Sequence, residues 1–298
     1  MKCNVCFITD SFALDLPVEQ ITESFAEASA LIAKMSTDFI EFSKACDFDE
    51  FIAMAIASRN LNEMGHLYSA AYDGNMSSPS KLELDSQHLT NITNNTPPVL
   101  ADRWVGLYSE NIDKQLSLQS NKTIYNEFSL VSYCSEIIVN YRRSHEDYAI
   151  AFDNVYKNLI FRTDIDGESL LFNKLNKMDG DYRNFALGMV TCLKFMNSYK
   201  VLPDDSLNNI EQINGSLNVP VTPEGRGKGH RDNNELKRDF YINKKKYANI
   251  NCEFHCKLQY PDGAPSNGKP KPNRIYFGFI EPTKSVHKIA IAHIGDHW

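Results

Sequence analysis

Residues 250–260 read INCEFHCKLQY, the most regular alternation of apolar and polar side chains in the chain. Phe254 and the apolar residues two positions away fall on one side of an extended backbone, whereas His255 and Lys257 fall on the other. Because successive side chains of a β-strand point to opposite faces of a sheet, this period of two predicts a strand with one core face and one solvated face. We therefore expect Phe254 to be buried and His255 to be exposed.

Two more strands are predicted after this one. Residues 274–280, RIYFGFI, alternate in the same way, and residues 288–294 form a third apolar run. The connection at 261–273 is rich in Pro, Gly, Asn and Lys, a composition typical of loops. Consecutive strands joined by short connections favour an antiparallel meander.

Before about residue 214 the apolar side chains recur at steps of three and four, which indicates helices. One such stripe consists of Ile21, Phe25, Ala28, Ile32 and Met35. Further helices are predicted after Asp47, over 122–142 and 145–160, and from Asp181 to Tyr199, whereas 73–100 form a long polar connection.

The fold class that these patterns predict is α+β. We expect a mainly α-helical module at residues 1–214, followed by a linker or exposed loop at 215–238, where Pro, Gly and charged residues gather. Residues 239–298 then form a small antiparallel β-sheet module. A chain of 298 residues is long enough for two such domains.

Electric charge is divided unevenly along the chain. Residues 223–298 hold 14 Lys and Arg residues against 8 Asp and Glu residues, a net charge of +6, and five of the eight histidines. The first 222 residues hold 17 basic and 30 acidic residues, a net charge of −13. A basic segment attracts nucleic acids, and imidazole moves protons near neutral pH. We expect the basic module to bind nucleic acid, RNA rather than DNA, and the acidic module to bind a protein partner or antitoxin.

The composition also indicates a compartment. No apolar run approaches the length of about 20 residues that a membrane-spanning helix needs, and the opening MKCNVCFITD lacks the pattern of a signal peptide. Seven cysteines, an odd number, fit buried thiols in a reducing compartment better than a set of disulfides. We expect a cytoplasmic protein without a membrane partner.

The solvated faces of the first two predicted strands carry four chemically useful side chains, namely His255, Lys257, Arg274 and Tyr276. Directly opposed residues of neighbouring strands lie about 5 Å apart, so these four can surround one small site.

Two histidines near the C-terminus are further candidates. In a regular strand His293 points to the core face with the neighbouring isoleucines, so it joins the other four only after a bulge. His297 follows Gly295, where the chain can turn back.

Imidazole, ammonium, guanidinium and phenol groups together suit cleavage of RNA without a metal ion. A base removes the proton of the 2′-hydroxyl, cations stabilise the phosphorane, and an acid protonates the leaving oxygen. Two alternatives stay open at this point. A half-exposed sheet has a charged face in any case, and the same residues suit phosphate binding without catalysis.

Residues 239–298, with the segments EFHCK at 253–257, RIYF at 274–277 and HIGDHW at 293–298, resemble the sheet of small bacterial ribonuclease toxins of the RelE/ParE type. The resemblance implies helices before the sheet, here supplied by 181–238, and a ribonuclease activity. The spacing of basic residues in that family is not reproduced, so no catalytic role is carried over to a particular residue.

Two further basic groups are candidate nucleic-acid contacts, although each composition is also typical of a solvated loop. The Gly-rich segment at 225–231 lacks the spacing of a phosphate-binding P-loop. The candidate contacts are Arg226, Lys228 and Arg231 in that segment, and Lys244, Lys245 and Lys246 at the tip of a predicted hairpin.

We predict neither a metal site nor a cofactor. Cys3 and Cys6 have the C-x-x-C spacing, but in a strand-like run their sulfur atoms face opposite ways. Cys252 and Cys256 share one face of the predicted strand about 13 Å apart, at about 3.3 Å per residue, while His255 points away.

These features favour a toxin-like or phage-defence effector whose basic sheet binds RNA and can cleave it without metal. The candidate catalytic residues are His255, Lys257, Arg274, Tyr276, His293 and His297. The alternative is a non-enzymatic adaptor, or a subunit of a larger complex, that binds protein or nucleic acid. The two differ in whether the polar side chains converge on one place or spread over a flat surface.

Overall fold

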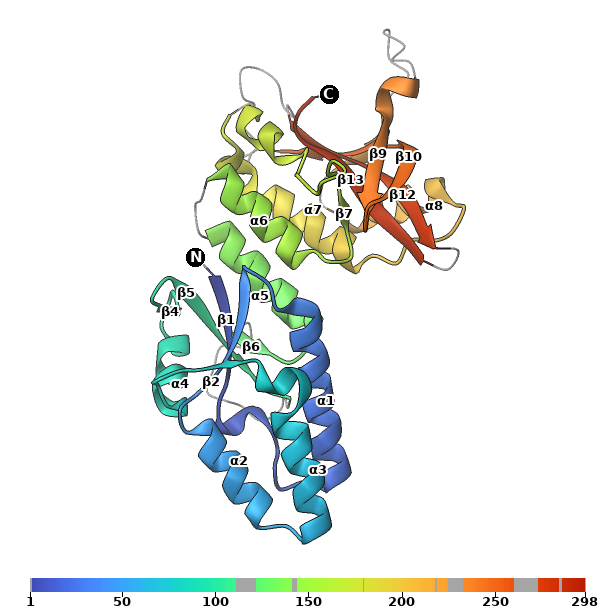
Figure 1. Ribbon diagram of the computed structural model, residues 1–298. Helices are drawn as coiled ribbons and strands as arrows, with labels where there is room; N and C mark the ends of the chain where they lie inside the picture. The colour runs from blue at the N-terminus through green and yellow to red at the C-terminus, as the bar shows by residue number, and fades with distance from the viewer. Residues whose placement is uncertain are drawn as a thin grey trace. The chain divides into compact units, whose positions relative to one another are not determined.

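The computed structural model describes residues 2–110, 122–140, 144–178, 180–217, 219–224, 233–259, 273–283 and 286–297. The chain forms two compact units, Met1–Ile137 and Ile138–Trp298, which we call unit 1 and unit 2. Figure 1 draws unit 1 in blue to green and unit 2 in green to red. Each unit combines helices with a sheet, so the mixed α+β class is confirmed.

Unit 1 is built on a mainly parallel sheet with the strand order β3-β2-β1-β5-β4, and β6 pairs with β5. The short β4 is its antiparallel member, at one edge. The strands are β1 (Lys2–Phe7), β2 (Ile40–Lys44), β3 (Ser80–Lys81), β4 (Val99–Leu100), β5 (Arg103–Tyr108) and β6 (Thr123–Ile124).

The helices of unit 1 follow the predicted apolar stripes. The stripe from Ile21 to Met35 is buried along the first of them, and the side chains of Asn60 and Asp85 cap the third and the fourth by accepting backbone N–H groups. The helices are α1 (Val18–Met35), α2 (Phe48–Ala57), α3 (Leu61–Tyr72), α4 (Ser86–Asn94) and α5 (Glu127–Asn140), whose last three residues belong to unit 2.

The expected helical module is therefore only part of the architecture, because the sequence analysis missed the parallel sheet. Strand β1 is buried from Cys3 to Phe7 and β5 from Trp104 to Tyr108. A strand covered on both faces is a continuous apolar run without alternation, so it gives no period of two. The region 73–100 also contains α4 rather than a simple connection.

Unit 2 packs helices against a five-stranded sheet with the order β7-β13-β12-β11-β8. The predicted antiparallel meander is confirmed for β11, β12 and β13, while the short β7 runs parallel to β13. The elements are α6 (His145–Val155), α7 (Ala186–Ser198) and α8 (Ser206–Ser216), with β7 (Ile160–Phe161), β8 (Val221–Pro223), β11 (Phe254–Leu258), β12 (Asn273–Thr283) and β13 (Val286–Asp296).

A separate hairpin, β9 (Lys237–Ile242) and β10 (Lys245–Asn251), lies across the β12–β13 strands, as Figure 1 shows in orange over red. Its turn residues Asn243 and Lys244 have φ angles of 51° and 63°. Two consecutive positive φ angles are the signature of a tight hairpin turn whose twist matches the flanking strands.

The predicted strand at 250–260 is in fact two strands in two sheets. The chain leaves the hairpin at Asn251 and enters the five-stranded sheet at Phe254. Ile250 and Cys252 pack with the hairpin residue Phe240, against one face of the large sheet. Phe254, Cys256 and Leu258 are buried on the other face. The alternation continues through the break, but its apolar side chains enter two different cores.

The central strand β12 is covered on both faces. Towards the helices, the rings of Phe254, Phe277 and Phe279 pack with centroids 5.6 to 6.1 Å apart. Towards the hairpin, Gly278 lies directly against the backbone carbonyl of Asn251. The hairpin covers this face around Gly278 and Ile280, and the polar residues of β12 lie at the other end of the same face.

This close approach predicts the effect of two glycine substitutions. In Gly278→Ala the new methyl group overlaps the carbonyl oxygen of Asn251, which must move, so we expect a loss of about 1–3 kcal/mol of stability or more. Gly215→Ala, in α8, has open space around the added carbon and should stabilise the helix by roughly 0.5–1 kcal/mol. Urea unfolding of the full chain measures both, and equal stabilities would contradict the packing described.

Candidate functional site

The strand register places the four candidate residues of the first two strands on one face. His255 of β11 lies opposite Tyr276 of β12, and Lys257 lies opposite Arg274. These pairs are cross-strand neighbours, as the alternation predicts. The structure therefore brings together imidazole, phenol, ammonium and guanidinium groups at the end of the sheet that the hairpin does not cover.

His293 joins this group through a bulge in β13. Tyr276 pairs with His293, but the next residue, Phe277, pairs with Ile291, so Ala292 is the extra residue. A bulge places two consecutive side chains on the same face. His293 consequently faces Tyr276, with ring centroids 5.9 Å apart, instead of the helical core.

A residue that the sequence analysis missed, Glu224, links the group. Its Oε2 accepts a hydrogen bond from the Tyr276 hydroxyl at 3.1 Å and lies 3.5 Å from Nδ1 of His255. Its Oε1 lies 3.5 Å from Nε2 of His297. One carboxylate thus contacts two imidazoles and a phenol, which come from three other segments of the chain.

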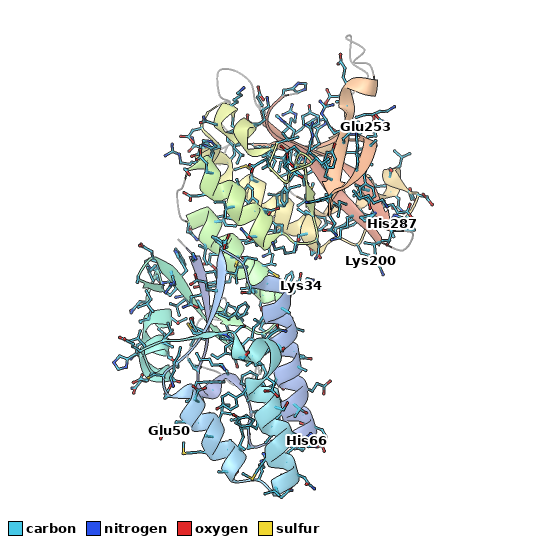
Figure 2. The ribbon with its side chains drawn as sticks, in the orientation of Figure 1. Lys34, Glu50, His66, Lys200, Glu253 and His287 are labelled. Atoms are coloured by element: carbon cyan, nitrogen blue, oxygen red, sulfur yellow. The ribbon has the colours of Figure 1, made fainter. Side chains whose placement is uncertain are left out.

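Position rather than motif identifies Glu224. It follows β8, whose edge pairing with β11 places it beside His255, and its backbone N–H donates to the carbonyl oxygen of Glu253 at 2.8 Å. Glu253, labelled in Figure 2, lies where the chain passes from β10 to β11. In the sequence, Glu224 ends a short extended segment inside the basic region. We had predicted that residues 215–238 form a linker or exposed loop, so this signal was not used.

Burial at this site differs from the expectation. His255 is 3% exposed, and Tyr276 is fully buried, so the predicted exposure of His255 is wrong. The polar face folds inwards because the three imidazoles surround Tyr276, with ring centroids 5.1 to 6.4 Å away. In this group His297 keeps its side chain 45% exposed.

Burial determines the proton chemistry of the two inner histidines. Desolvation lowers the pKa of His255 to about 4, although the nearby Glu224 carboxylate acts in the opposite direction. Desolvation also lowers the pKa of His293, whose Nε2 donates a hydrogen bond to the carbonyl oxygen of Asp296 at 2.8 Å. His255 is therefore a neutral imidazole at pH 7.

The cationic residues lie at the edge of the group. Lys257 and Arg274 are both partly buried, and Nη1 of Arg274 donates to the carbonyl oxygen of Asn273 at 3.0 Å. Burial lowers the pKa of Arg274, while the nearby Tyr276 and Glu224 raise it. The positive charges thus lie beside Glu224, while a second carboxylate, that of Asp296, lies 3.7 Å from Nε2 of His293.

The other predicted nucleic-acid contacts lie elsewhere. Lys244 is exposed in the hairpin turn, the Lys245 ammonium lies 5.0 Å from the ring centroid of Tyr247, and Lys246 pairs with Asp239 at 2.7 Å. Arg226, Lys228 and Arg231 lie outside the described residues.

The cysteines occupy separate cores. Cys3 and Cys6 are buried in β1, whereas Cys252 packs under the hairpin and Cys256 packs near Cys192 of α7 on the other face. The expectation that Cys252 and Cys256 share a face is wrong, because the chain changes sheets between them. In the described parts of the chain, no three His, Cys, Asp or Glu side chains are arranged to hold a metal ion.

Comparison of the chain with protein-family models, with curated proteins and with solved structures finds no match. The resemblance to RelE/ParE toxins consequently stays a prediction. No helix within the described residues combines the length and the apolar content required to cross a bilayer.

The buried His255 predicts a pH dependence of stability. Its pKa is about 4 in the folded chain, against an ordinary value of 6.5, so between these pH values the unfolded chain binds more protons. Stability therefore falls as the pH falls from 6.5 to 4. Relative to His255→Gln, the native chain should lose about 3 kcal/mol more over this range.

Urea unfolding at a series of pH values measures this difference. Glu224, Arg274 and Lys257 face His255 in both proteins, so most of their own contribution cancels. His66→Gln, an exposed histidine of α3 labelled in Figure 2, is the matched control and should leave the profile unchanged. Identical profiles for the native chain and His255→Gln would show that His255 titrates normally.

Proposed function

We propose that this chain is a toxin-like or phage-defence effector whose C-terminal sheet binds RNA and cleaves it without a metal ion. The observation that supports cleavage most directly is the contact of the Glu224 carboxylate with Tyr276, His255 and the more exposed His297. A carboxylate that orients an accessible imidazole is a recurring arrangement for a general base.

His297 is the base in this proposal. Its imidazole is nearly half exposed, so it can reach the 2′-hydroxyl of a bound ribose, and Glu224 lies 3.5 Å from its Nε2. A neighbouring carboxylate stabilises the imidazolium that forms when the imidazole accepts the proton. The attack of the 2′-oxygen on the adjacent phosphorus breaks the bond to the 5′-oxygen and leaves a 2′,3′-cyclic phosphate.

Lys257 and Arg274 provide positive charge for the phosphate. They face each other across β11 and β12, and their partial burial increases the strength of their interaction with an anion. In the proposal the Arg274 guanidinium stabilises the phosphorane oxygens. The Lys257 ammonium gives its proton to the leaving 5′-oxygen.

Tyr276 and His255 act as positioning residues rather than as groups that touch RNA, because both are buried. The Tyr276 hydroxyl donates to Glu224 and fixes the direction of the carboxylate. His255 fills the space beside Glu224 as a neutral ring.

The proposal predicts cleavage that survives EDTA and yields 2′,3′-cyclic phosphate ends. His297→Ala and Arg274→Ala should each lower the cleavage rate by about 10²-fold or more, since each removes a group that acts in the transition state. The measurement is single-turnover cleavage of ribosomal and messenger RNA by the full chain, with ribosomes present in a parallel series.

His287→Ala is the matched control. His287 lies on the same strand β13, at the end opposite to His293, and Figure 2 labels it. The His287→Ala variant should cleave RNA as the native chain does. Induced expression of the native chain, but not of His297→Ala, should arrest bacterial growth. If His297→Ala and His287→Ala behave alike in both assays, catalysis by this group is rejected.

One observation favours the second candidate, a non-enzymatic adaptor. Tyr276, His255 and His293 are all at most 3% exposed, which also suits a hydrogen-bonded polar core that only specifies the fold. The adaptor predicts that His297→Ala keeps all functions in cells, while Tyr276→Phe lowers the melting temperature because Glu224 loses a donor. Growth assays and melting curves of the two variants together decide between the candidates.

A further inference from the structure

A second cluster of positive charge lies on the same face of the sheet, at its β7 edge. β7 pairs with β13 so that Ile160 meets Ala290 and Phe161 meets Ile291, and the N–H of Arg162 donates to the carbonyl oxygen of Ile291 at 3.1 Å. In this register Arg162 lies beside the bulge at Ala292, next to His293. Ile160 packs towards the hairpin, so by alternation Arg162 also faces the hairpin side.

The hairpin brings a second guanidinium to this place. Arg238 lies on β9 two residues before Phe240, which is buried against the sheet, so both side chains leave β9 on the sheet-facing side. Nη1 of Arg238 donates to the carbonyl oxygens of Glu235 and Lys237 at 2.6 and 2.7 Å. These bonds hold the guanidinium in one direction.

The two guanidiniums lie close enough to repel each other. Burial lowers the pKa of Arg238 and the charge of Arg162 lowers it further, and both charges act on the buried thiol of Cys252 between the hairpin and the sheet. Arg238 and Lys174, from the turn at Phe172–Lys177, also lower the pKa of His293. Several positive groups therefore surround one place beside His293.

Arg162 has no counter-ion in the described part of the chain. Its Nε is inaccessible to solvent and has no hydrogen-bond partner there. Asp239, a carboxylate on which the charge of Arg162 acts, pairs instead with Lys246 at 2.7 Å. A partly buried guanidinium that makes no ion pair and lies near a second positive charge is stabilised by a bound anion.

We propose that Arg162 and Arg238 bind a phosphate group on this face of unit 2. Two guanidiniums present paired N–H donors that match the oxygens of a phosphate. The place lies on the other side of His293 from Lys257 and Arg274, along the same sheet face. If the ligand is RNA, which rests on the proposed function, the site holds a backbone phosphate next to the one that is cleaved.

Inorganic phosphate is the first probe, because it requires no RNA activity. The melting temperature of the full chain should rise with phosphate relative to chloride at equal ionic strength, since a ligand that binds only the folded state stabilises it. Arg162→Gln and Arg238→Gln should each abolish this rise, and Arg162→Lys should keep only part of it. Arg183→Gln, which removes an exposed partner of Asp181, should keep the full rise.

The same variants carry a second readout without any anion. In chloride, Arg162→Gln should melt at the same temperature as the native chain or higher, because it removes the repulsion from Arg238. No phosphate-specific rise in the native chain, or an undiminished rise in both Gln variants, would overturn the site.

An oligoribonucleotide distinguishes the two sources of phosphate. If the ligand is RNA, Arg162→Gln should weaken its binding about tenfold and reduce the salt slope by about one. A phosphate effect without any change in RNA affinity would overturn the RNA assignment and leave a site for a small phosphate ligand. If the native chain binds no RNA at all, the proposed function fails, and the phosphate result still stands or falls by itself.

Discussion

Burial of β12 on both faces is the constraint on which the rest of unit 2 depends. On the helical side its aromatic residues pack against Phe254, and on the hairpin side the backbone of Asn251 approaches Gly278 closely. Because the hairpin covers only the half of that face around Gly278 and Ile280, the other half must be completed by polar side chains. The position of the hairpin therefore determines where a polar cluster can form, and that place is the row that contains Tyr276.

Next to Tyr276, the Glu224 carboxylate lies between one buried imidazole and one that is exposed to solvent. Glu224 contacts His255, which is buried and neutral, and His297, which reaches solvent. The two imidazoles differ in role because His255 is buried, so that desolvation penalises its charged form, whereas the side chain of His297 is 45% exposed. Burial likewise lowers the pKa of Arg274 and of Arg238, and the charge of Arg162 lowers that of Arg238 further.

The sequence predicts those parts of the fold in which one face of a strand is apolar and the other polar. The placement of His255 and Tyr276 on one face of neighbouring strands follows from such alternation. Strand β1 could not be found in this way, because burial on both faces removes the alternation. The change of sheet between Cys252 and Phe254 could not be predicted for a related reason. Each half of the segment keeps a period of two, but the apolar side chains of the two halves pack into different cores.

At the candidate site, too, the sequence predicts features that depend on neighbouring residues and not those that depend on contacts between distant segments. The six candidate residues come from local pattern and residue type, whereas their burial and the contacts of three of them with Glu224 depend on segments far apart in the chain. A single glutamate before a Gly-rich segment carries no periodic signal.

The bulge at Ala292 also has an evolutionary consequence, because a regular ladder needs one residue fewer between Ile291 and His293. Deletion of Ala292 would remove the bulge and still leave His293 opposite Tyr276. Related chains that keep the site can therefore be one residue shorter at this point.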